Sequence, residues 1–348
     1  MKRIFAILVS LTLVVSLAAG CSGGGSAPTS SGTASGEPSS NAPITVKALV
    51  TANESTPVAV VMSDLFKAIT ERSGGRLTFD VTYGASSVFA GEGELFDMVR
   101  NGSADIANMA LTNFNSFAEE IDVTCWPYVF ESAEHISNFF NGDKSTELVS
   151  KIEQGAGIKM ITSAFMGIRN LTTKGVEVRT PADLKGVKIR CMDSSIYVNG
   201  MNAMGATAVP IAYSELYFSL QTGVANGQEN QMSVIEESKL NEVQDTICKT
   251  QHLYAINAFI ANDDFWATLP ADLQELVQNT YKEFLMGYAD TVQSIDDALE
   301  AKFVQQGMKV VDDVDRQAFI DKCSEVFLST YGDKEDWVNL FNAIKEAA

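Results

Sequence analysis

A single uninterrupted helical pattern near the C-terminal end limits the architectures open to this chain. Between residues 273 and 303, apolar residues recur at helical spacing without an internal proline, which predicts one helix of about thirty residues. At 1.5 Å per residue, such a helix is on the order of 45 Å long, more than the width of one lobe. No second segment matches it as a coiled-coil partner, so we expect it to run across two lobes. The apolar positions are Leu273, Leu276, Val277, Tyr281, Phe284, Leu285, Tyr288, Val292, Ile295, Leu299 and Phe303.

The first 43 residues have the pattern of an export signal followed by a tether. Lys2 and Arg3 precede an apolar run that is too short to span a membrane, and small residues lead to Cys21. This arrangement resembles a bacterial lipobox, in which the leader is cut before Cys21 and its sulfur carries lipid, although Ala18 stands where leucine is more usual. A plain secretory signal with a chance cysteine is the alternative. Residues 22–43 are almost entirely Gly, Ser, Thr, Ala and Pro, which predicts a flexible linker.

The rest of the chain, about 305 residues, suits two lobes better than one core. In its first part, strands expected at 44–50, 77–83 and 104–110 alternate with helices at 58–72 and 94–101. This alternation predicts an α/β fold with a mostly parallel sheet covered on both faces. Ligands of such sheets bind beyond the carboxyl ends of the strands, which selects loops near Asn53, Ser86–Ser87 and Thr112.

Arg190 ends a short apolar strand in the second part. Its guanidinium is always charged and offers a planar fork of donors that matches a carboxylate, and Asn230 adds an amide further along. A surface ion pair would explain such an arginine equally well. The formal net charge of −19 argues against a nucleic-acid partner, because that recognition needs a basic face.

Four sequence blocks around this strand follow one another at fixed spacing. They resemble the signature of the DctP family, the extracytoplasmic solute-binding proteins of TRAP transporters, and the resemblance extends from about Ile44 to the C-terminus. It implies a two-lobe fold like that of the periplasmic binding proteins, of the class II type, with the long helix spanning the hinge. The blocks are Asp183-Leu184-Lys185-Gly186-Val187-Lys188-Ile189-Arg190, Ala212-Tyr213-Ser214-Glu215-Leu216-Tyr217, Leu220-Gln221-Thr222-Gly223 and Asn226-Gly227-Gln228-Glu229-Asn230.

The resemblance also implies roles for individual residues. Arg190 would form the main salt bridge to a ligand carboxylate, with Arg169 of the motif Gly167-Ile168-Arg169 as a second clamp. Tyr213 and Asn230 would close around the ligand. Loops near Asn53, Glu92 and Thr112 of the first lobe would determine specificity. Trp126 lies in an aromatic segment that either lines the cleft or belongs to the core.

We expect four segments in the domain organisation. Residues 1–20 would be a lipoprotein signal peptide and residues 21–43 a lipid-anchored linker. The first lobe would combine residues 44–168 with 254–294, and the second would combine 169–253 with 295–348.

Metal, cofactor and enzyme chemistry find little support in the residues. Two histidines lie far apart, no cysteines form a C-x-x-C pair, and the one G-x-S-x-G match falls in the linker rather than between a strand and a helix. An α/β enzyme is therefore a poor alternative, whereas a ligand-sensing protein of the same fold stays open. Cysteine spacing does not decide whether Cys125, Cys191, Cys248 and Cys323 form disulfides.

The function we expect is therefore that of a solute-binding protein outside the cytoplasm, anchored to a bacterial cell membrane through lipid on Cys21. It would capture an organic acid between its lobes and deliver it to the membrane permease subunits of a TRAP transporter. The sequence leaves open which acid binds and whether the protein forms oligomers.

Overall fold

A nine-stranded mixed sheet runs through the part of the chain that the computed structural model describes, residues 42–54 and 56–348. The strand order is β2-β1-β3-β8-β4-β7-β5-β6, and β9 pairs with β8. The strands are β1 (Ile44–Val50), β2 (Leu77–Tyr83), β3 (Ile106–Ala110), β4 (Ile158–Thr173), β5 (Lys188–Cys191), β6 (Thr207–Pro210), β7 (Gly227–Gln231), β8 (Thr246–Asn262) and β9 (Lys309–Val311).

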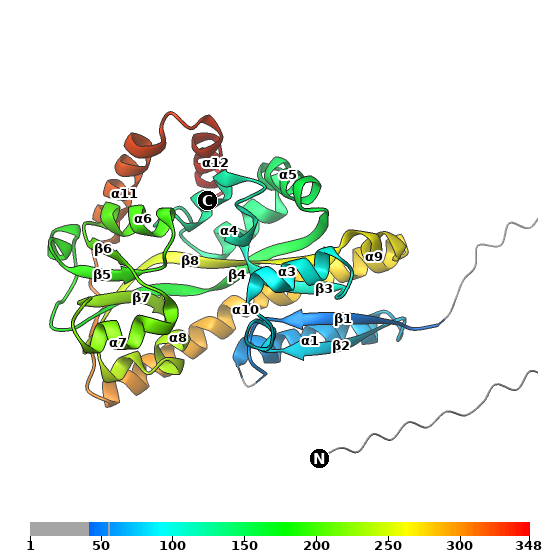
Figure 1. Ribbon diagram of the computed structural model, residues 1–348, viewed down its shortest axis with the longest axis horizontal. Coiled ribbons are helices and arrows are strands. Elements are labelled where there is room, and N and C mark those ends of the chain that lie inside the picture. Colours follow the sequence, from blue (N-terminus) through cyan, green and yellow to red (C-terminus); the bar gives the residue numbers. More distant parts are fainter. Residues whose placement is uncertain (1–41, 55) are drawn as a thin grey trace, which may run out of the picture. The chain divides into compact units, whose positions relative to one another are not determined.

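Two long antiparallel strands, β4 and β8, connect the two ends of this sheet (Figure 1). The first-lobe strand β3 pairs with residues 257–261 of β8, near its C-terminal end. The second-lobe strand β7 pairs with residues 169–173 of β4, also near its C-terminal end. Each long strand would therefore take part in both expected lobes, and the register between the two strands shifts at Met160/Thr162, at Phe165/Gly167 and at Arg169/Leu171.

Apart from β9, which pairs in parallel with β8, the sheet is parallel only toward its two ends. The pairs β1–β2 and β1–β3 are parallel, as are β5–β6 and β5–β7, which agrees with the expected α/β pattern. The mostly parallel sheet expected for the first part of the chain is found in β1, β2 and β3, whereas the central pairs β3–β8, β4–β8 and β4–β7 are antiparallel. The reason is topological: the chain crosses through β4 and returns through β8, and two such crossings run in opposite directions.

Helices cover the sheet and follow the predicted helical patterns closely. The helix expected at 58–72 begins at Pro57, where the hydroxyl of Thr56 caps it by accepting from the amide of Ala59. The helices are α1 (Pro57–Arg72), α2 (Ala85–Val88), α3 (Glu92–Arg100), α4 (Ala133–Asn141), α5 (Thr146–Ala156), α6 (Ser195–Met204), α7 (Leu216–Gln221), α8 (Met232–Glu237), α9 (Asp263–Thr268), α10 (Ala271–Gln305), α11 (Arg316–Tyr331) and α12 (Glu335–Lys345).

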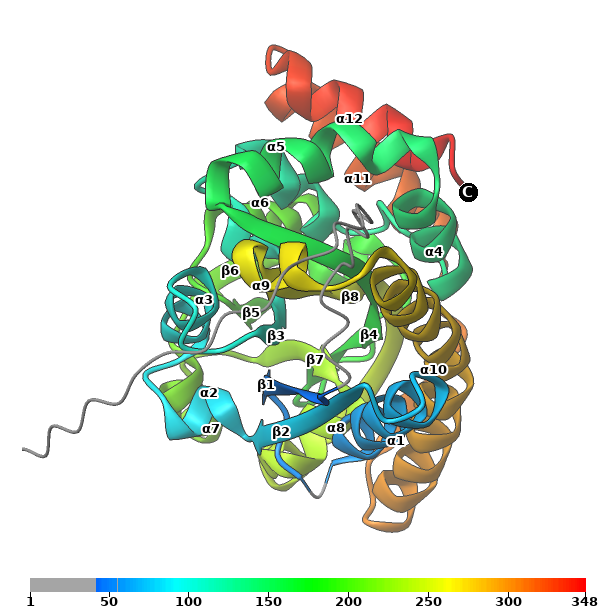
Figure 2. The ribbon, with the colours of Figure 1, turned by 90° about the vertical axis from the view of Figure 1, so that its right-hand side faces the viewer.

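The predicted long helix is confirmed as α10, which has 35 residues. Its N-terminal half packs beside α1, as Figure 2 shows, and buries Leu273 and Tyr281 in a core shared with β1 and β2. Its C-terminal end buries Phe303 in a different core that contains Leu216 of α7 and Ile235 of α8. The helix thereby joins two cores that have no other helix in common among the described residues.

The structure does not test the predicted leader and linker or the predicted lobe boundaries. The predicted leader, Cys21 and most of the predicted linker lie outside the described residues. Residues 42–348 group as one compact unit, so the lobe boundaries stay a prediction. Among the described residues, no helix combines the length and apolar character needed to cross a bilayer. The four cysteines that are described, Cys125, Cys191, Cys248 and Cys323, are free thiols.

Candidate binding cleft

A cleft of about 660 Å³ lies against the middle of β4 and β8. The loop after β1 contributes Asn53 to its lining, and the 3-10 helix η5 (Tyr213–Glu215) contributes Tyr213. Gln231 comes from the end of β7, Asn257 from β8 and Tyr288 from the middle of α10. The cleft is therefore lined by both expected lobes and by all three segments that connect them.

Arg190 is a buried cation without a carboxylate partner. Its side chain comes from β5, and the residue is only 2% exposed. Nε and one terminal nitrogen donate to the carbonyl oxygen of Ile211, at 2.8 and 2.6 Å. Burial lowers the pKa of Arg190, against the opposing charge of Glu229. No carboxylate among the described residues forms an ion pair with it, which is an expensive arrangement for a buried charge unless an anion joins it.

Arg169 is equally buried but its charge is already matched. Its guanidinium makes a two-point ion pair with the carboxylate of Glu229, through Nε to Oε2 and through Nη2 to Oε1 at 2.9 Å. Nη2 also donates to the backbone oxygen of Glu229 at 2.9 Å. The structure thus brings Arg169 close to the second-lobe motif, but as the partner of a protein carboxylate.

Glu229 is fully buried, and its environment keeps it charged. Burial acts to raise the pKa of this carboxyl, but the adjacent Arg169 guanidinium outweighs burial and lowers the pKa to about 2. The Nε2 atom of His252 lies 3.5 Å from Glu229 Oε2. Burial lowers the pKa of His252, although the adjacent Glu229 carboxylate acts in the opposite direction. Glu229 belongs to the sequence block at 226–230, but nothing local in the sequence links it to Arg169, so this role could not be predicted.

Asn230 and Tyr213 occupy different positions relative to the cleft. Asn230 is 4% exposed, and its amide donates to Gln228 Oε1 at 2.7 Å, so it belongs to the buried polar layer between β4 and β7. Tyr213 is 55% exposed, lines the cleft and shares a hydrogen bond with the hydroxyl of Ser238. Arg190, Arg169 and Asn230 are buried and do not line the cleft themselves.

The other expected contacts divide between the cleft and the core. Asn53 lines the cleft, but Glu92 and Thr112 do not. Glu92 Oε2 accepts from the amide of Ala110 at 3.1 Å and from Asn113 Nδ2 at 2.5 Å, which braces the 3-10 helix η1 (Leu111–Phe114). Trp126 is 1% exposed and donates from its indole nitrogen to the oxygen of Cys323 at 3.0 Å. Its place is in the core.

The cleft also contains residues that sequence reasoning did not propose as contacts. Gln231 follows Asn230 directly, and Asn108 and Asn257 come from β3 and β8. One face of α10 contributes four apolar side chains and an acid. The apolar residues belong to the helical pattern predicted between residues 273 and 303. Their position midway along a helix that is expected to cross both lobes is the sequence signal that could have identified them as cleft residues. They are Tyr288, Val292, Ile295 and Leu299, with Asp296 beside them.

The lining of the cleft combines amide, hydroxyl and apolar side chains. Within the described ranges, no group of three or more His, Cys, Asp or Glu side chains is placed to hold a metal ion. What the cleft offers is amides, hydroxyls, an apolar wall from α10, and the unmatched charge of Arg190 nearby.

Comparisons with known proteins agree on one family. The model of the bacterial extracellular solute-binding proteins, family 7, matches residues 49–333. A solute-binding protein of Verminephrobacter eiseniae is 26% identical over 276 residues, covering 79% of this chain and 82% of that one. The C4-dicarboxylate-binding periplasmic protein DctP of Vibrio cholerae is 27% identical over 226 residues, covering 65% and 67%.

A solved structure shows the same fold. It is a TRAP periplasmic solute-binding protein from Sulfitobacter with bound β-D-galacturonate, and it superposes with a TM-score of 0.73 at 23% identity. The match covers 87% of this chain and all of that one. The two-lobe fold expected from the sequence is therefore confirmed.

Proposed function

The chain belongs to bacterial extracellular solute-binding protein family 7, and we propose from this premise that it captures an organic acid in the cleft and delivers it to a TRAP-type transporter. The family is one of transport proteins that act outside the cytoplasm, not of enzymes. The relative from Vibrio cholerae is named for C4-dicarboxylates, and the Sulfitobacter structure holds a sugar acid. Both ligands are carboxylates, which supports the same class for this chain.

The observation that carries the proposal is the contrast between two buried arginines. The charge of Arg169 is neutralised by an ion pair with Glu229. Arg190 donates its hydrogen bonds to the carbonyl oxygen of Ile211, which carries no formal charge. A buried guanidinium without a counter-ion is stabilised strongly by a carboxylate that can accept two parallel hydrogen bonds. We therefore assign Arg190 as the carboxylate clamp and Arg169 as a positioning residue that holds β4 against β7.

Ligand contacts from both lobes would drive closure. A ligand shifts the open–closed equilibrium only through contacts that differ between the two states. Asn53 from the loop after β1 and Tyr213 from η5 approach the cleft from the two proposed lobes, and Asn230 supports the floor from behind. We propose the lobe boundaries expected from the sequence, with β4, β8 and α10 as the three connections.

We also propose lipid attachment at Cys21, which would keep the protein at the cell membrane beside its permease. The support is the residue pattern before Cys21 and the small, polar composition that follows it. Metabolic labelling with a fatty acid tests this directly. The native chain should carry label and sediment with membranes, and Cys21→Ser should do neither.

A thermal-shift screen tests the clamp. The purified protein is heated with small organic acids and, as controls, with the corresponding amides. A ligand that binds the native state raises its apparent stability by mass action. One class of acid should raise the melting temperature and its amides should not, and Arg190→Lys should abolish the shift because lysine lacks the planar fork. Arg179→Lys, at an exposed arginine, is the matched control. Equal shifts in both variants would refute the assignment.

A further inference from the structure

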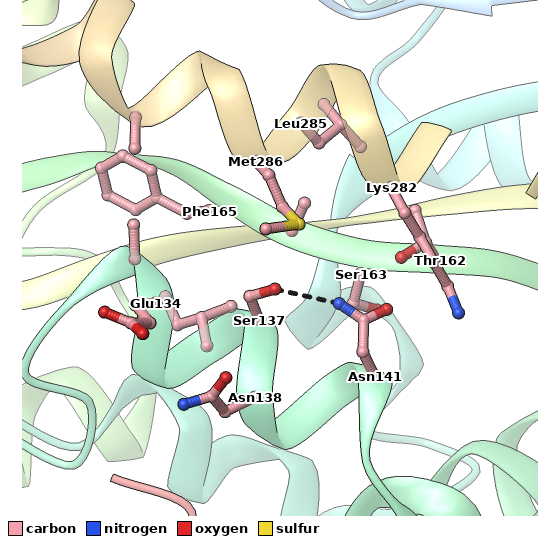
Figure 3. Close-up of a pocket in the computed structure, with 14 residues that line it drawn as sticks. Glu134, Ser137, Asn138, Asn141, Thr162, Ser163, Phe165, Lys282, Leu285 and Met286 are labelled. Carbon is pink, nitrogen blue, oxygen red and sulfur yellow. Dashed lines mark hydrogen bonds between the residues drawn. The ribbon is translucent and has the colours of Figure 1, made fainter. Parts of the chain in front are cut away.

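A second cavity, of about 290 Å³, lies between α4, β4 and α10 (Figure 3). It shares β4 and α10 with the binding cleft but uses different residues of each. Residues 162–165 of β4 line this cavity, whereas the next residues, Met166 and Gly167, line the cleft. On the helix, Ala289 lines this cavity and Tyr288 lines the cleft. The cavity is therefore a separate space behind the hinge.

One wall of this cavity is an open edge of the sheet. Residues 158–168 of β4 pair with β8 on one side, whereas β7 joins β4 only from Arg169 onward. Over the described residues, no strand pairs with the other side of β4 at Thr162–Phe165, the stretch that lines the cavity. In an antiparallel pair, every second residue turns its N–H and C=O away from its partner strand. Backbone donors and acceptors therefore face this space.

A buried hydroxyl lies within one wall of this cavity. Ser163 is 5% exposed, and its Oγ atom has no hydrogen-bond partner among the described residues. Buried polar groups in native proteins are nearly always paired, so an unpaired one in a cavity wall points to something that binds there. Lys282 of α10 lines the same cavity, and within the described ranges it forms no ion pair.

The cavity has one polar end and one apolar end. In Figure 3, Lys282, Ser163 and Asn141 gather at one end, where the amide of Asn141 donates to Ser137 Oγ at 3.0 Å. Phe165 lies toward the other end, and the flexible, 63% exposed side chain of Met286 stands between them. The exposed acid Glu134 lies away from Lys282, on the side of Phe165.

We propose that this cavity binds a small amphiphilic carboxylate, with its apolar body against Phe165, Leu285 and Met286. Its carboxylate would accept from the Lys282 ammonium group and from the Ser163 hydroxyl, once that hydroxyl turns from the wall into the cavity about the Cα–Cβ bond. The volume, near the lower end of the range for small-molecule pockets, suits a ligand with a single ring or a short chain. The site is independent of the clamp at Arg190.

Fluorine NMR with 4-fluorophenylacetate tests this site, with 4-fluorophenylacetamide as the uncharged control. The protein carries Arg190→Gln, so that the cleft does not bind the probe through its clamp. The acid should bind, and its affinity should exceed that of the amide by at least tenfold. Ala289→Phe, which fills the cavity, should abolish binding, whereas Ala298→Phe at an exposed position of α10 should not.

Lys282→Gln keeps the test decisive if Ala289→Phe fails to fold. This exposed substitution should weaken binding of the acid at least fivefold and leave the amide unchanged. Failure of the acid to bind overturns the proposal, as does equal affinity for acid and amide. Retained binding in a folded Ala289→Phe variant overturns it as well. None of these outcomes bears on the thermal-shift test of Arg190.

Discussion

The carbonyl oxygen of Ile211 holds the guanidinium of Arg190 through two hydrogen bonds, at 2.8 and 2.6 Å. This contact fixes the orientation of Arg190 without neutralising it, because a carbonyl oxygen carries no formal charge. Arg169 is fixed just as firmly, but by the carboxylate of Glu229. The same chemical group thus serves as an available cation at one position and as an internal cross-link at the other.

Removing the charge of Glu229 should destabilise the protein strongly. Glu229→Gln leaves the Arg169 guanidinium buried without a counter-ion, and breaking such a pair costs about 3–5 kcal/mol. Glu177→Gln, which breaks the exposed pair with Arg179, should change the stability far less, because solvent screens that pair. Urea unfolding measures both. Similar unfolding free energies for the two variants would contradict the role given to Glu229.

Asp296 should make the protein less stable as the pH rises. Burial, reinforced by the charge of Asp297 and opposed by Lys249, raises the pKa of Asp296 from 3.8 to about 7. A raised pKa in the folded state contributes stability that is present below pH 3.8 and is lost as the pH passes 7. Asp296→Asn should therefore stabilise the protein more at pH 8 than at pH 5, by roughly 1–2 kcal/mol after allowance for partial solvent screening.

The matched control is Asp290→Asn, at an exposed position on the same helix. Its effect on the melting temperature should be the same at both pH values. An Asp296→Asn variant whose gain does not grow with pH would show that this carboxyl is solvated in solution.

Gly227 should not tolerate even a methyl group. A Cβ atom there would lie 2.3 Å from the backbone oxygen of Thr172 and 2.9 Å from Ile189, so β7 would have to move away from β4. Overpacking of this kind costs about 1–3 kcal/mol. Gly93→Ala, on α3 with nothing within 4 Å of the added atom, should instead stabilise slightly. Equal melting temperatures for the two variants would contradict the close approach of the strands.

Substitutions at two expected contact residues should separate affinity from stability. Tyr213→Ala removes an exposed ring from the cleft lining and should weaken binding of the acid about tenfold, which corresponds to roughly 1.4 kcal/mol. Glu92→Gln should lower the melting temperature, because it weakens the brace on η1, yet leave the affinity unchanged within twofold. Calorimetric titration with the identified acid measures the affinity of each variant. Weaker binding by Glu92→Gln together with unchanged binding by Tyr213→Ala would contradict both assignments.

The sequence predicted the parts of the fold that depend on local periodicity. The 3.6-residue period revealed α10, and the alternation of strands and helices revealed the parallel ends of the sheet. The pair between Arg169 and Glu229 was beyond such reasoning, because it depends on the antiparallel register of β4 and β7 across 60 positions. The apolar stripe of α10 was predicted from the sequence, but its role was not. The same periodic pattern is expected for a helix that packs in a core and for one that lines a cleft.

The strand order also governs when the first lobe can fold during synthesis. Its strand β3 lies between β1 and β8 and ends at Ala110, but β8, which completes its hydrogen bonding, begins only at Thr246. In a growing chain, the sheet formed by β1, β2 and β3 therefore lacks its neighbour β8 until most of the protein has been synthesised. Contacts so distant in sequence form slowly. For a protein of a family that acts outside the cytoplasm, this order keeps the sheet around β3 incomplete until residues 246–262 have been synthesised.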